Sequence, residues 1–182
     1  TRRWTKVTGT NPKVGQAARR SNSARRGGNG FDAVGIAVLT GERPVTPSAV
    51  LETILYVRDL DAAEVFYRDV LGLEWVSKVA GRHVFFRIGQ QMLLLFNPVV
   101  TAVPPPPDTR LPVPPHGAVG EGHVCFRATA DEIPQWRSHL IANGVAIEAE
   151  VEWPKGGRSI YFRDPAGNCL EFAEARIWGI EA

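Results

Sequence analysis

The alternation of apolar and polar residues between positions 50 and 97 predicts a strand, a helix and three further strands. VLETILYV has the period of two expected of a strand, so Leu55 would face the helix while Glu52 and Tyr56 face away from it. In DAAEVFYRDVLG the apolar residues recur at helical spacing, and Asp61 is the expected N-cap. LEWVSKV, HVFFRI and QMLLLF then follow as short strands.

Residues 121–174 repeat this order of elements. GHVCFRA predicts a strand that places His123 on the face away from its helix, and DEIPQWRSHLIANG predicts the helix, with Asp131 as its N-cap. VAIEAEVEW, RSIYFR and NCLEFAE predict three strands, and in the last of them Cys169 and Glu171 share a face. The duplication predicts an α+β fold of two tandem βαβββ units, whose curved mixed sheets face each other and enclose a cleft.

A proline-rich connector, PVVTAVPPPPDTRLPVPPHGAVG, joins the two units. Residues 98–120 contain eight prolines, which lack the backbone N–H that helices and inner strands need. We therefore expect a stiff crossover without helix or inner strand. The whole folded domain is expected to span residues 48–182, with unit one at 50–97 and unit two at 121–174.

The first 47 residues differ in composition from the rest of the chain. They hold nine Lys or Arg residues against Asp32 and Glu42, a net charge of about +7 that leaves about −5 for the remainder. Such an Arg-, Gly- and Ser-rich segment buries too little apolar surface to offset the entropy of ordering, so it is expected to be a mostly disordered extension. A polyanion-binding tail and a transit peptide are the alternatives.

Composition restricts the functional classes. No apolar run reaches the roughly 18 residues that a membrane span requires, which argues against a membrane protein. The acidic balance of residues 48–182 argues against nucleic acid as the ligand of the folded domain. Two cysteines are too few for a disulfide framework, so reduced thiols and a cytoplasmic location are expected.

Three polar residues stand on predicted inner faces of related strands. Glu52 and His123 occupy equivalent places in the first strand of each unit, and Glu171 interrupts the apolar last strand. One imidazole and two carboxylates suit a divalent metal such as Mn, Fe, Ni, Co or Zn, and three protein ligands leave positions for water or substrate. The ordinary alternative for each residue alone is a solvated or hydrogen-bonded surface group.

Two stretches carry a family resemblance. LYVRDLDAAEVFYRDVLGL resembles the opening, and FRDPAGNCLEF the closing signature, of the vicinal oxygen chelate superfamily, which includes glyoxalase I, extradiol dioxygenases, thiol transferases and bleomycin-binding proteins. The resemblance covers residues 50–174. It implies that Glu171 and His123 are metal ligands and that Glu52 stands where the family usually has His. The family's fourth ligand position falls at Leu94 or Leu95, which favours a three-ligand site over that of glyoxalase I.

The resemblance implies a metal-dependent lyase, isomerase, thiol transferase or dioxygenase that acts on a small substrate chelated through neighbouring oxygens. In that reaction Glu52 and Glu171 would be the catalytic carboxylates, with Glu52 as general base. The alternative is a non-catalytic protein that sequesters a small molecule, as bleomycin-binding members do. Members of this size often pair, so a homodimer is expected.

Further residues are candidates for orienting the substrate: Tyr56, His116, Arg158 and Tyr161. Strand parity does not decide which of Arg158 and Tyr161 faces the cleft. His116 ends the crossover and is either a lid residue or an exposed loop residue. Cys125 and Cys169 share faces with the metal candidates and are expected to line the cavity rather than to bind metal.

Overall fold

The computed structural model describes residues 5–6 and 46–180. Unit one forms a four-stranded sheet in the order β2-β5-β4-β3, from β2 (Glu52–Tyr56), β3 (Glu74–Val79), β4 (His83–Ile88) and β5 (Gln91–Phe96). The first and last of these strands are parallel, and the other pairs are antiparallel. This order is that of a βαβββ unit, as the sequence predicts.

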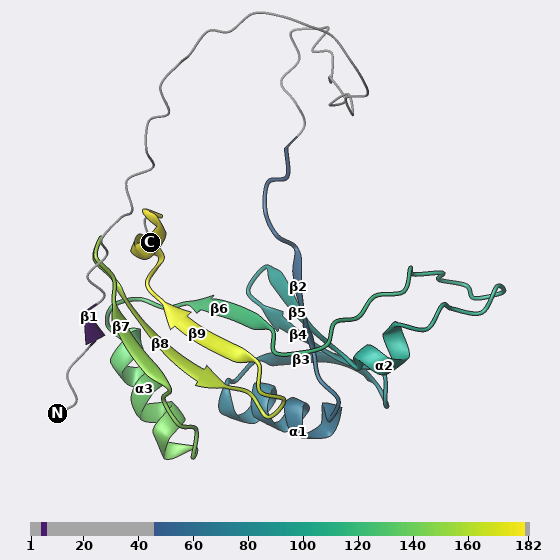
Figure 1. Ribbon diagram of the computed structural model, residues 1–182, viewed down its shortest axis with the longest axis horizontal. Coiled ribbons are helices and arrows are strands. Elements are labelled where there is room, and N and C mark those ends of the chain that lie inside the picture. Colours follow the sequence, from purple (N-terminus) through teal and green to yellow (C-terminus); the bar gives the residue numbers. More distant parts are fainter. Residues whose placement is uncertain (1–4, 7–45, 181–182) are drawn as a thin grey trace, which may run out of the picture. The chain divides into compact units, whose positions relative to one another are not determined.

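Unit two repeats the arrangement with β6 (His123–Arg127), α3 (Glu132–Ala142), β7 (Ala149–Glu152), β8 (Arg158–Arg163) and β9 (Cys169–Ala173). β6 again pairs in parallel with the last strand, β9, and the sheet order is β1-β7-β8-β9-β6. The helix of unit one, α1 (Leu60–Val65), and the helix of unit two, α3, lie on the same side of the two sheets (Figure 1). We call the sheet faces turned away from the helices the open faces.

The strand alternation expected from the sequence is confirmed by burial. Leu55 and Val57 are buried in the core, which lies between the sheets and their helices, whereas Glu52 is exposed. In unit two Ile160, Phe162 and Leu170 are fully buried toward α3. The period-two pattern therefore assigns the faces of the strands correctly.

The helix of unit one begins earlier than expected. Asp59, not Asp61, is the N-cap of α1 (Leu60–Val65), and its carboxylate accepts hydrogen bonds from the backbone N–H groups of Asp61 and Ala62. The prediction of Asp61 was wrong because two aspartates stand two residues apart and both fit a capping pattern. The helix continues as a π-helical segment, η1 (Phe66–Val70).

The N-cap of α3 is Asp131, as expected, but its side chain makes no capping hydrogen bond. Thr129 and Glu132 bond reciprocally instead: Glu132 accepts from the backbone N–H and hydroxyl of Thr129, and its own N–H donates to that hydroxyl.

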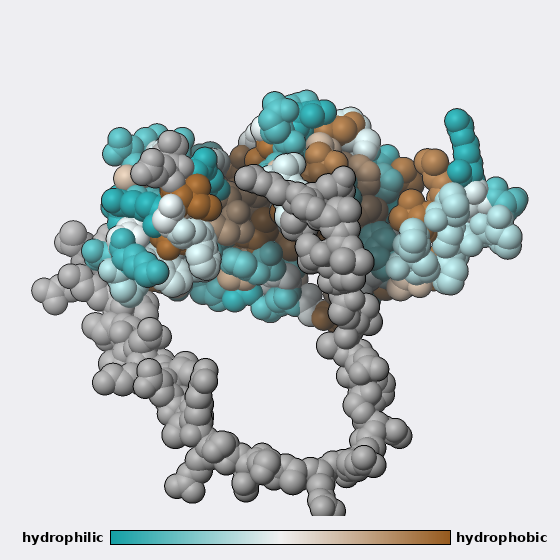
Figure 2. All heavy atoms as spheres, turned by 90° about the horizontal axis from the view of Figure 1, so that it is seen from above, coloured by the Kyte–Doolittle hydropathy of each residue, from teal (hydrophilic) through white to brown (hydrophobic). Residues whose placement is uncertain are grey.

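The crossover contains a short helix, which the sequence interpretation excluded. α2 (Pro98–Thr101) begins after Asn97, whose side chain accepts a hydrogen bond from the N–H of Val99. Pro98 occupies the first helical turn, where a missing N–H costs nothing, so proline content alone did not prevent a helix there. The apolar side chains of α2 and the crossover are largely solvent-exposed (Figure 2), with Leu111 at 74% and Val103 at 63%.

Thr5 and Lys6 form β1 (Thr5–Lys6), which pairs in parallel with β7. This strand differs from the unstructured extension expected there. The remainder of that expectation concerns residues 1–4 and 7–45, which lie outside the described residues. Among the described residues, no helix is long and apolar enough to cross a membrane.

The two sheets meet through their edge strands β2 and β6, and a buried hydrogen-bond network joins them there. Asp164 accepts from the hydroxyl of Tyr67 at 2.9 Å and from the amide of Asn168 at 2.8 Å. The same Asn168 amide also donates to the carbonyl of Tyr56, and its oxygen accepts from the N–H of Gly122 at 2.7 Å. The DPAGN turn of unit two is thus fastened to the helix and first strand of unit one.

This network yields a stability prediction. Asn168→Ala removes the acceptor of the Gly122 N–H and one donor to Asp164 in a place that is 1% exposed, and buried polar groups without partners are costly. We expect a loss of about 3 kcal/mol in the free energy of unfolding, measured by urea denaturation. The control Asn143→Ala, at the exposed end of α3, should cost under about 1 kcal/mol. Equal losses for both variants would contradict this role of Asn168.

Candidate functional site

His123 and Glu171 lie together on the open face of the unit-two sheet. They come from the neighbouring strands β6 and β9, and His123 Nε2 is 3.4 Å from Glu171 Oε2. The Glu171 side chain is 7% exposed, and its second oxygen, Oε1, is buried without a hydrogen-bond partner. The imidazole is half-exposed, so one side of the pair is open to solvent.

The tautomer of His123 follows from its second contact. Its Nδ1 lies 3.0 Å from the carbonyl oxygen of Cys169, which can only accept, so Nδ1 must carry a hydrogen. The neutral ring then presents the lone pair of Nε2 toward the carboxylate of Glu171. Two acceptors face each other, and a proton or a cation between them would satisfy both. A carbonyl that fixes the far nitrogen is the usual support of a metal-binding histidine.

Cys125 and Tyr161 flank the carboxylate. Cys125 is directly opposite Glu171 in the β6–β9 ladder, and Tyr161 is opposite it in the β8–β9 ladder. Burial, reinforced by the negative charge of Glu171, raises the pKa of the Cys125 thiol to about 12. Burial is also the main cause that raises the pKa of Tyr161 to about 12; Ser159 opposes the shift and Glu171 adds to it. Both groups are therefore neutral near pH 7 and surround Glu171 with protonated side chains.

Glu52 lies apart from this pair. It begins β2, while the far end of β2 at Tyr56 meets the network that holds Gly122, the residue before His123. Four residues of extended strand, about 13 Å, therefore separate Glu52 from the end of β2 that adjoins His123. The sheets meet by their edges instead of facing each other, which explains why the convergence expected within one chain does not occur. In residues 5–6 and 46–180, no group of three or more His, Cys, Asp or Glu side chains is arranged to hold a metal ion.

The strand registers decide between the two candidates for the unit-one counterpart of Glu171. Leu94 pairs with Ile54 on β2 as Glu171 pairs with Cys125 on β6. Leu94, not Leu95, is therefore the equivalent position, and it is an apolar residue on the open face.

Tyr56 and His116 meet on the open face of the unit-one sheet. The Tyr56 hydroxyl is 2.9 Å from His116 Nδ1, and the His116 ring packs edge-on against Phe96 at 4.7 Å. The backbone N–H of His116 donates to the carbonyl of Thr101 in α2, so the end of the crossover is also held against its beginning. His116 is thus a docked residue and not a freely exposed one.

His83 is a residue whose position the sequence did not reveal. Its ring stacks on Phe85 at 4.1 Å, and its Nδ1 is buried without a hydrogen-bond partner. Burial, together with the charge of Arg82, lowers the pKa of His83 and favours the neutral ring. Alternation along HVFFRI could have placed His83 on the open face with Phe85, although it could not have shown the burial.

Arg158 and Tyr161 point to opposite faces of β8, which resolves the parity question. Arg158 Nε is 3.3 Å from a carboxylate oxygen of the buried Glu174, and its Nη2 donates to the carbonyl of Ala130. Arg158 therefore lies on the helix side, away from Glu171. Tyr161 shares the open face with Glu171 and His123, and its ring stacks on that of His123 at a centroid distance of 6.4 Å.

The donor set at Glu171 fits a divalent ion. One carboxylate with a buried, unpartnered oxygen and one oriented imidazole are ligands for Mn, Fe, Co, Ni or Zn. They account for two positions of a coordination sphere, so further donors have to come from outside this pair.

The duplicated βαβββ fold is that of the vicinal oxygen chelate class of proteins. The chain belongs to the glyoxalase/bleomycin resistance protein/dioxygenase superfamily, whose family model matches residues 49–172. Among solved structures, a lactoylglutathione lyase from Agrobacterium tumefaciens is similar, with 49% identity and a TM-score of 0.69 over 75% of this chain and 100% of that one.

Two more distant structures agree with this fold. A glyoxalase/bleomycin resistance protein/dioxygenase from Nocardioides has 23% identity and a TM-score of 0.55, over 72% of this chain and 85% of that one. An integron cassette protein from the mobile metagenome of V. cholerae has 25% identity and a TM-score of 0.55, over 73% of this chain and 99% of that one.

The raised pKa of Cys125 predicts slow alkylation. In a Cys169→Ser background, the thiolate fraction at pH 8 should be on the order of a thousandfold below that of a thiol with a pKa of 9, since the pKa lies near 12. The rate of reaction with iodoacetamide should rise about tenfold per pH unit from pH 7 to 9.5 without a plateau.

Removing the charge in Glu171→Gln should accelerate the reaction, because the carboxylate disfavours the thiolate. The partial desolvation of the thiol remains in this variant, so the rate should stay below that of a free thiol. Glu150→Gln, on the other face of the sheet beside Arg137, is the matched control and should not change the rate. A rise of only about threefold between pH 8.5 and 9.5, as expected of a thiol with a pKa of 9, would show that the thiol is not shifted.

Proposed function

We propose that this protein is a metal-dependent enzyme of its superfamily, acting on a small substrate that binds through neighbouring oxygen atoms. The observation that carries the proposal is the buried carboxylate of Glu171, which has one unpartnered oxygen and faces the oriented imidazole of His123. A sequestering protein needs no such pair, and an uncompensated buried carboxylate is costly to a fold.

The roles of the residues follow from their places. His123 and Glu171 would hold the ion, which would supply Lewis acidity toward the substrate oxygens. Tyr161, neutral beside Glu171, can donate a hydrogen bond to a substrate oxygen. Glu52 is the candidate third ligand and general base, and it is exposed and therefore accessible to a proton of the substrate.

We propose that a second copy of the chain supplies Glu52, so that the enzyme is a homodimer with sites between copies. Three observations support this: Glu52 lies apart from the pair within one chain, the pair has an open side, and both sheets leave an open face. A two-fold pairing would bring the unit-one open face of one copy against the unit-two open face of the other, twice per dimer. Tyr56 and His116 would then contact the substrate from the same sheet as Glu52.

The reaction itself can be narrowed. The similarity to a lactoylglutathione lyase makes that activity the first to assay. Leu94 stands where sheet one would otherwise contribute a second ligand, so a site with three protein ligands is proposed. That number of ligands fits a dioxygenase or thiol transferase reaction better than it fits the four-ligand site of glyoxalase I.

A sequestering protein is the alternative, and one feature favours it. The unit-one open face carries a cluster of rings around Phe96, formed by His83, Phe85 and His116, which could hold an apolar ligand without any metal. The two functions differ in their need for a metal.

Metal analysis tests the proposal. Protein purified without a histidine tag should contain a first-row divalent metal, and Glu171→Ala should lower its affinity for added Mn, Co or Zn by at least about a hundredfold, measured by calorimetry. Glu174→Gln is the matched control, because that buried carboxylate serves Arg158 on the other face. Metal-free native protein whose weak metal uptake is the same in Glu171→Ala would favour the sequestering function.

Mixed dimers test the shared site. Co-expression of Glu52→Ala and Glu171→Ala chains, each with its own non-histidine tag, should give heterodimers with one intact site, about half the native metal content. His123→Ala with Glu171→Ala is the matched control: both changes fall on the same sheet, so every site in that heterodimer is defective. Equal metal content in the two heterodimers would overturn the assignment of Glu52 to the partner copy.

A further inference from the structure

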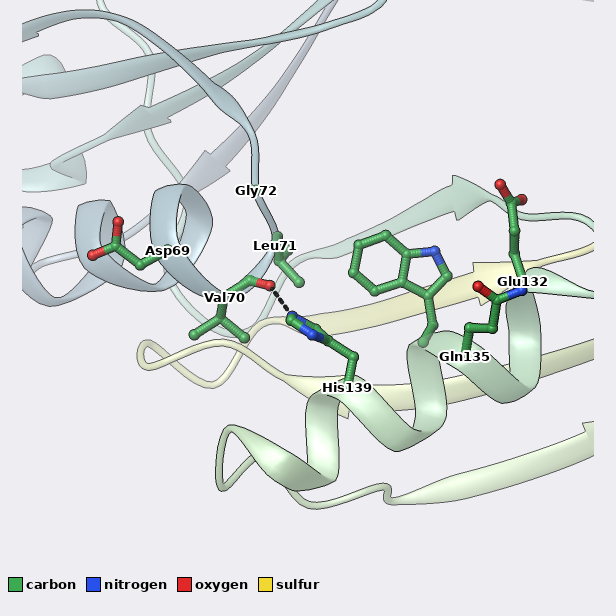
Figure 3. Close-up of a pocket in the computed structure, with 8 residues that line it drawn as sticks. Asp69, Val70, Leu71, Gly72, Glu132, Gln135 and His139 are labelled. Carbon is green, nitrogen blue, oxygen red and sulfur yellow. Dashed lines mark hydrogen bonds between the residues drawn. The ribbon is translucent and has the colours of Figure 1, made fainter.

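A cavity on the helix side of the molecule joins the two units. It has a volume of about 390 Å³ and lies between the end of η1, at Val70 and Leu71, and one face of α3. Figure 3 shows Glu132 and Gln135 at one end of this cavity and Asp69 at the other. Between them His139 Nε2 donates to the carbonyl of Val70 at 2.8 Å. This cavity is separate from the open-face pair of His123 and Glu171.

A second cavity adjoins the first and is mostly apolar. It has a volume of about 360 Å³, and it shares Leu71, Glu132 and Trp136 with the first cavity. Its walls include Leu93 of β5 and Phe172 of β9, so it reaches the hydrophobic core between the units. The two cavities together offer a polar end and an apolar end on either side of one indole ring.

Trp136 is positioned to recognise a ligand. One face of its indole stacks on Phe172 at 4.2 Å with an interplanar angle of 14°, which fixes the ring. The ring also meets the His139 ring edge-on at a centroid distance of 5.7 Å, and it lines both cavities, so the rest of its surface is available to a bound molecule. A fixed indole beside a carboxylate is a suitable place for an organic cation.

The negative charge for such a cation comes from Glu132, an exposed residue that lines both cavities. Glu132 Oε2 accepts two hydrogen bonds from Thr129, which lower the pKa of Glu132, while its Oε1 has no hydrogen-bond partner among the described residues. Asp69, at the other end, is neutralised by Arg68 at 2.6 Å.

We propose that these two cavities form a binding site for a small organic cation with an apolar group, such as an arylalkylamine. The ammonium would lie in the first cavity between the Glu132 carboxylate and the Trp136 indole, and the apolar group would enter the second. Such a ligand would contact Leu71 of unit one and α3 of unit two at once, and it would touch the helix side of β6, the strand that carries His123 on its other face.

The test uses three probes of one shape and different charge. 2-Phenylethylamine should bind and shift the indole N–H resonance of Trp136 in ¹⁵N-labelled protein. The neutral 2-phenylethanol should bind at least about fivefold more weakly, because it lacks the positive charge that the indole and the Glu132 carboxylate attract. The anionic phenylacetate should not bind measurably, because the Glu132 carboxylate repels it. Equal affinity for all three probes would overturn the proposed cation site.

Variants locate the site. Trp136→Leu and Glu132→Gln should each weaken 2-phenylethylamine binding by about tenfold or more. The amide oxygen of Gln can still accept the hydrogen bonds that the N–H and hydroxyl of Thr129 donate. Trp178→Leu is the matched control, since Trp178 is exposed on the C-terminal helix η2 (Ala175–Trp178) and should leave binding unchanged. Because Trp136→Leu can disturb packing on Phe172, Glu132→Gln, which leaves the core unchanged, decides the outcome. Unaltered binding in Glu132→Gln would place the amine elsewhere.

Discussion

The structure depends on the hydrogen bonds that Asp164 and Asn168 make at the edge between the two sheets. Tyr67 of the first helix, the carbonyl that ends β2 and the N–H of Gly122 all reach this one turn. Tyr67, Asp164 and Asn168 are buried, so the hydrogen bonds that link them must form together. Gly122 has no side chain because a Cβ there would lie 2.8 Å from a methyl carbon of Leu55. Since His123 follows Gly122 directly, the hydrogen bond between Gly122 and Asn168 also fixes the backbone position of His123.

The two units use one scaffold for different purposes. In both, the first strand pairs in parallel with the last, and the helix covers one face. On the open faces the equivalent positions diverge: Leu94 stands in unit one where Glu171 stands in unit two. Unit one has an aromatic and apolar open face on which the half-buried His83 packs among rings, whereas unit two has thiols, a tyrosine and the His–Glu pair. The two open faces therefore differ in chemical character although the scaffold beneath them is the same.

The sequence predicts the elements better than their assembly. Period-two alternation assigned the faces of β2, β6 and β9 correctly because a buried sheet face imposes strict spacing. Alternation could not assign the N-cap of α1, since Asp59 and Asp61 both have suitable side chains. It also could not find α2, which forms because Asn97 caps the helix and Pro98 stands in its first turn. The meeting of Glu52 with His123 was expected from a facing arrangement of the sheets. Strand parity says which way a side chain points, but the edge contact between β2 and β6 decides what it meets, and that contact is set by distant residues such as Asn168.

Burial of Glu171 is best understood by comparison with its own repeat. At Leu94 the same backbone position, with the same neighbouring ladder, accommodates an apolar side chain at 6% exposure. The scaffold therefore does not require a carboxylate there, and a carboxylate at 5% exposure with one unpartnered oxygen is less favourable for the folded chain than a leucine would be. Cys125 and Tyr161 stay protonated beside it and do not cancel its charge. The compensating positive charge must come from a bound cation or from a proton on His123. Either one reaches Glu171 from solvent through the side of the pair that the half-exposed imidazole leaves open. The buried charge of Glu171 lowers the stability of the fold, and it lies on a face that solvent can reach. A bound cation would therefore be favoured most strongly at this residue.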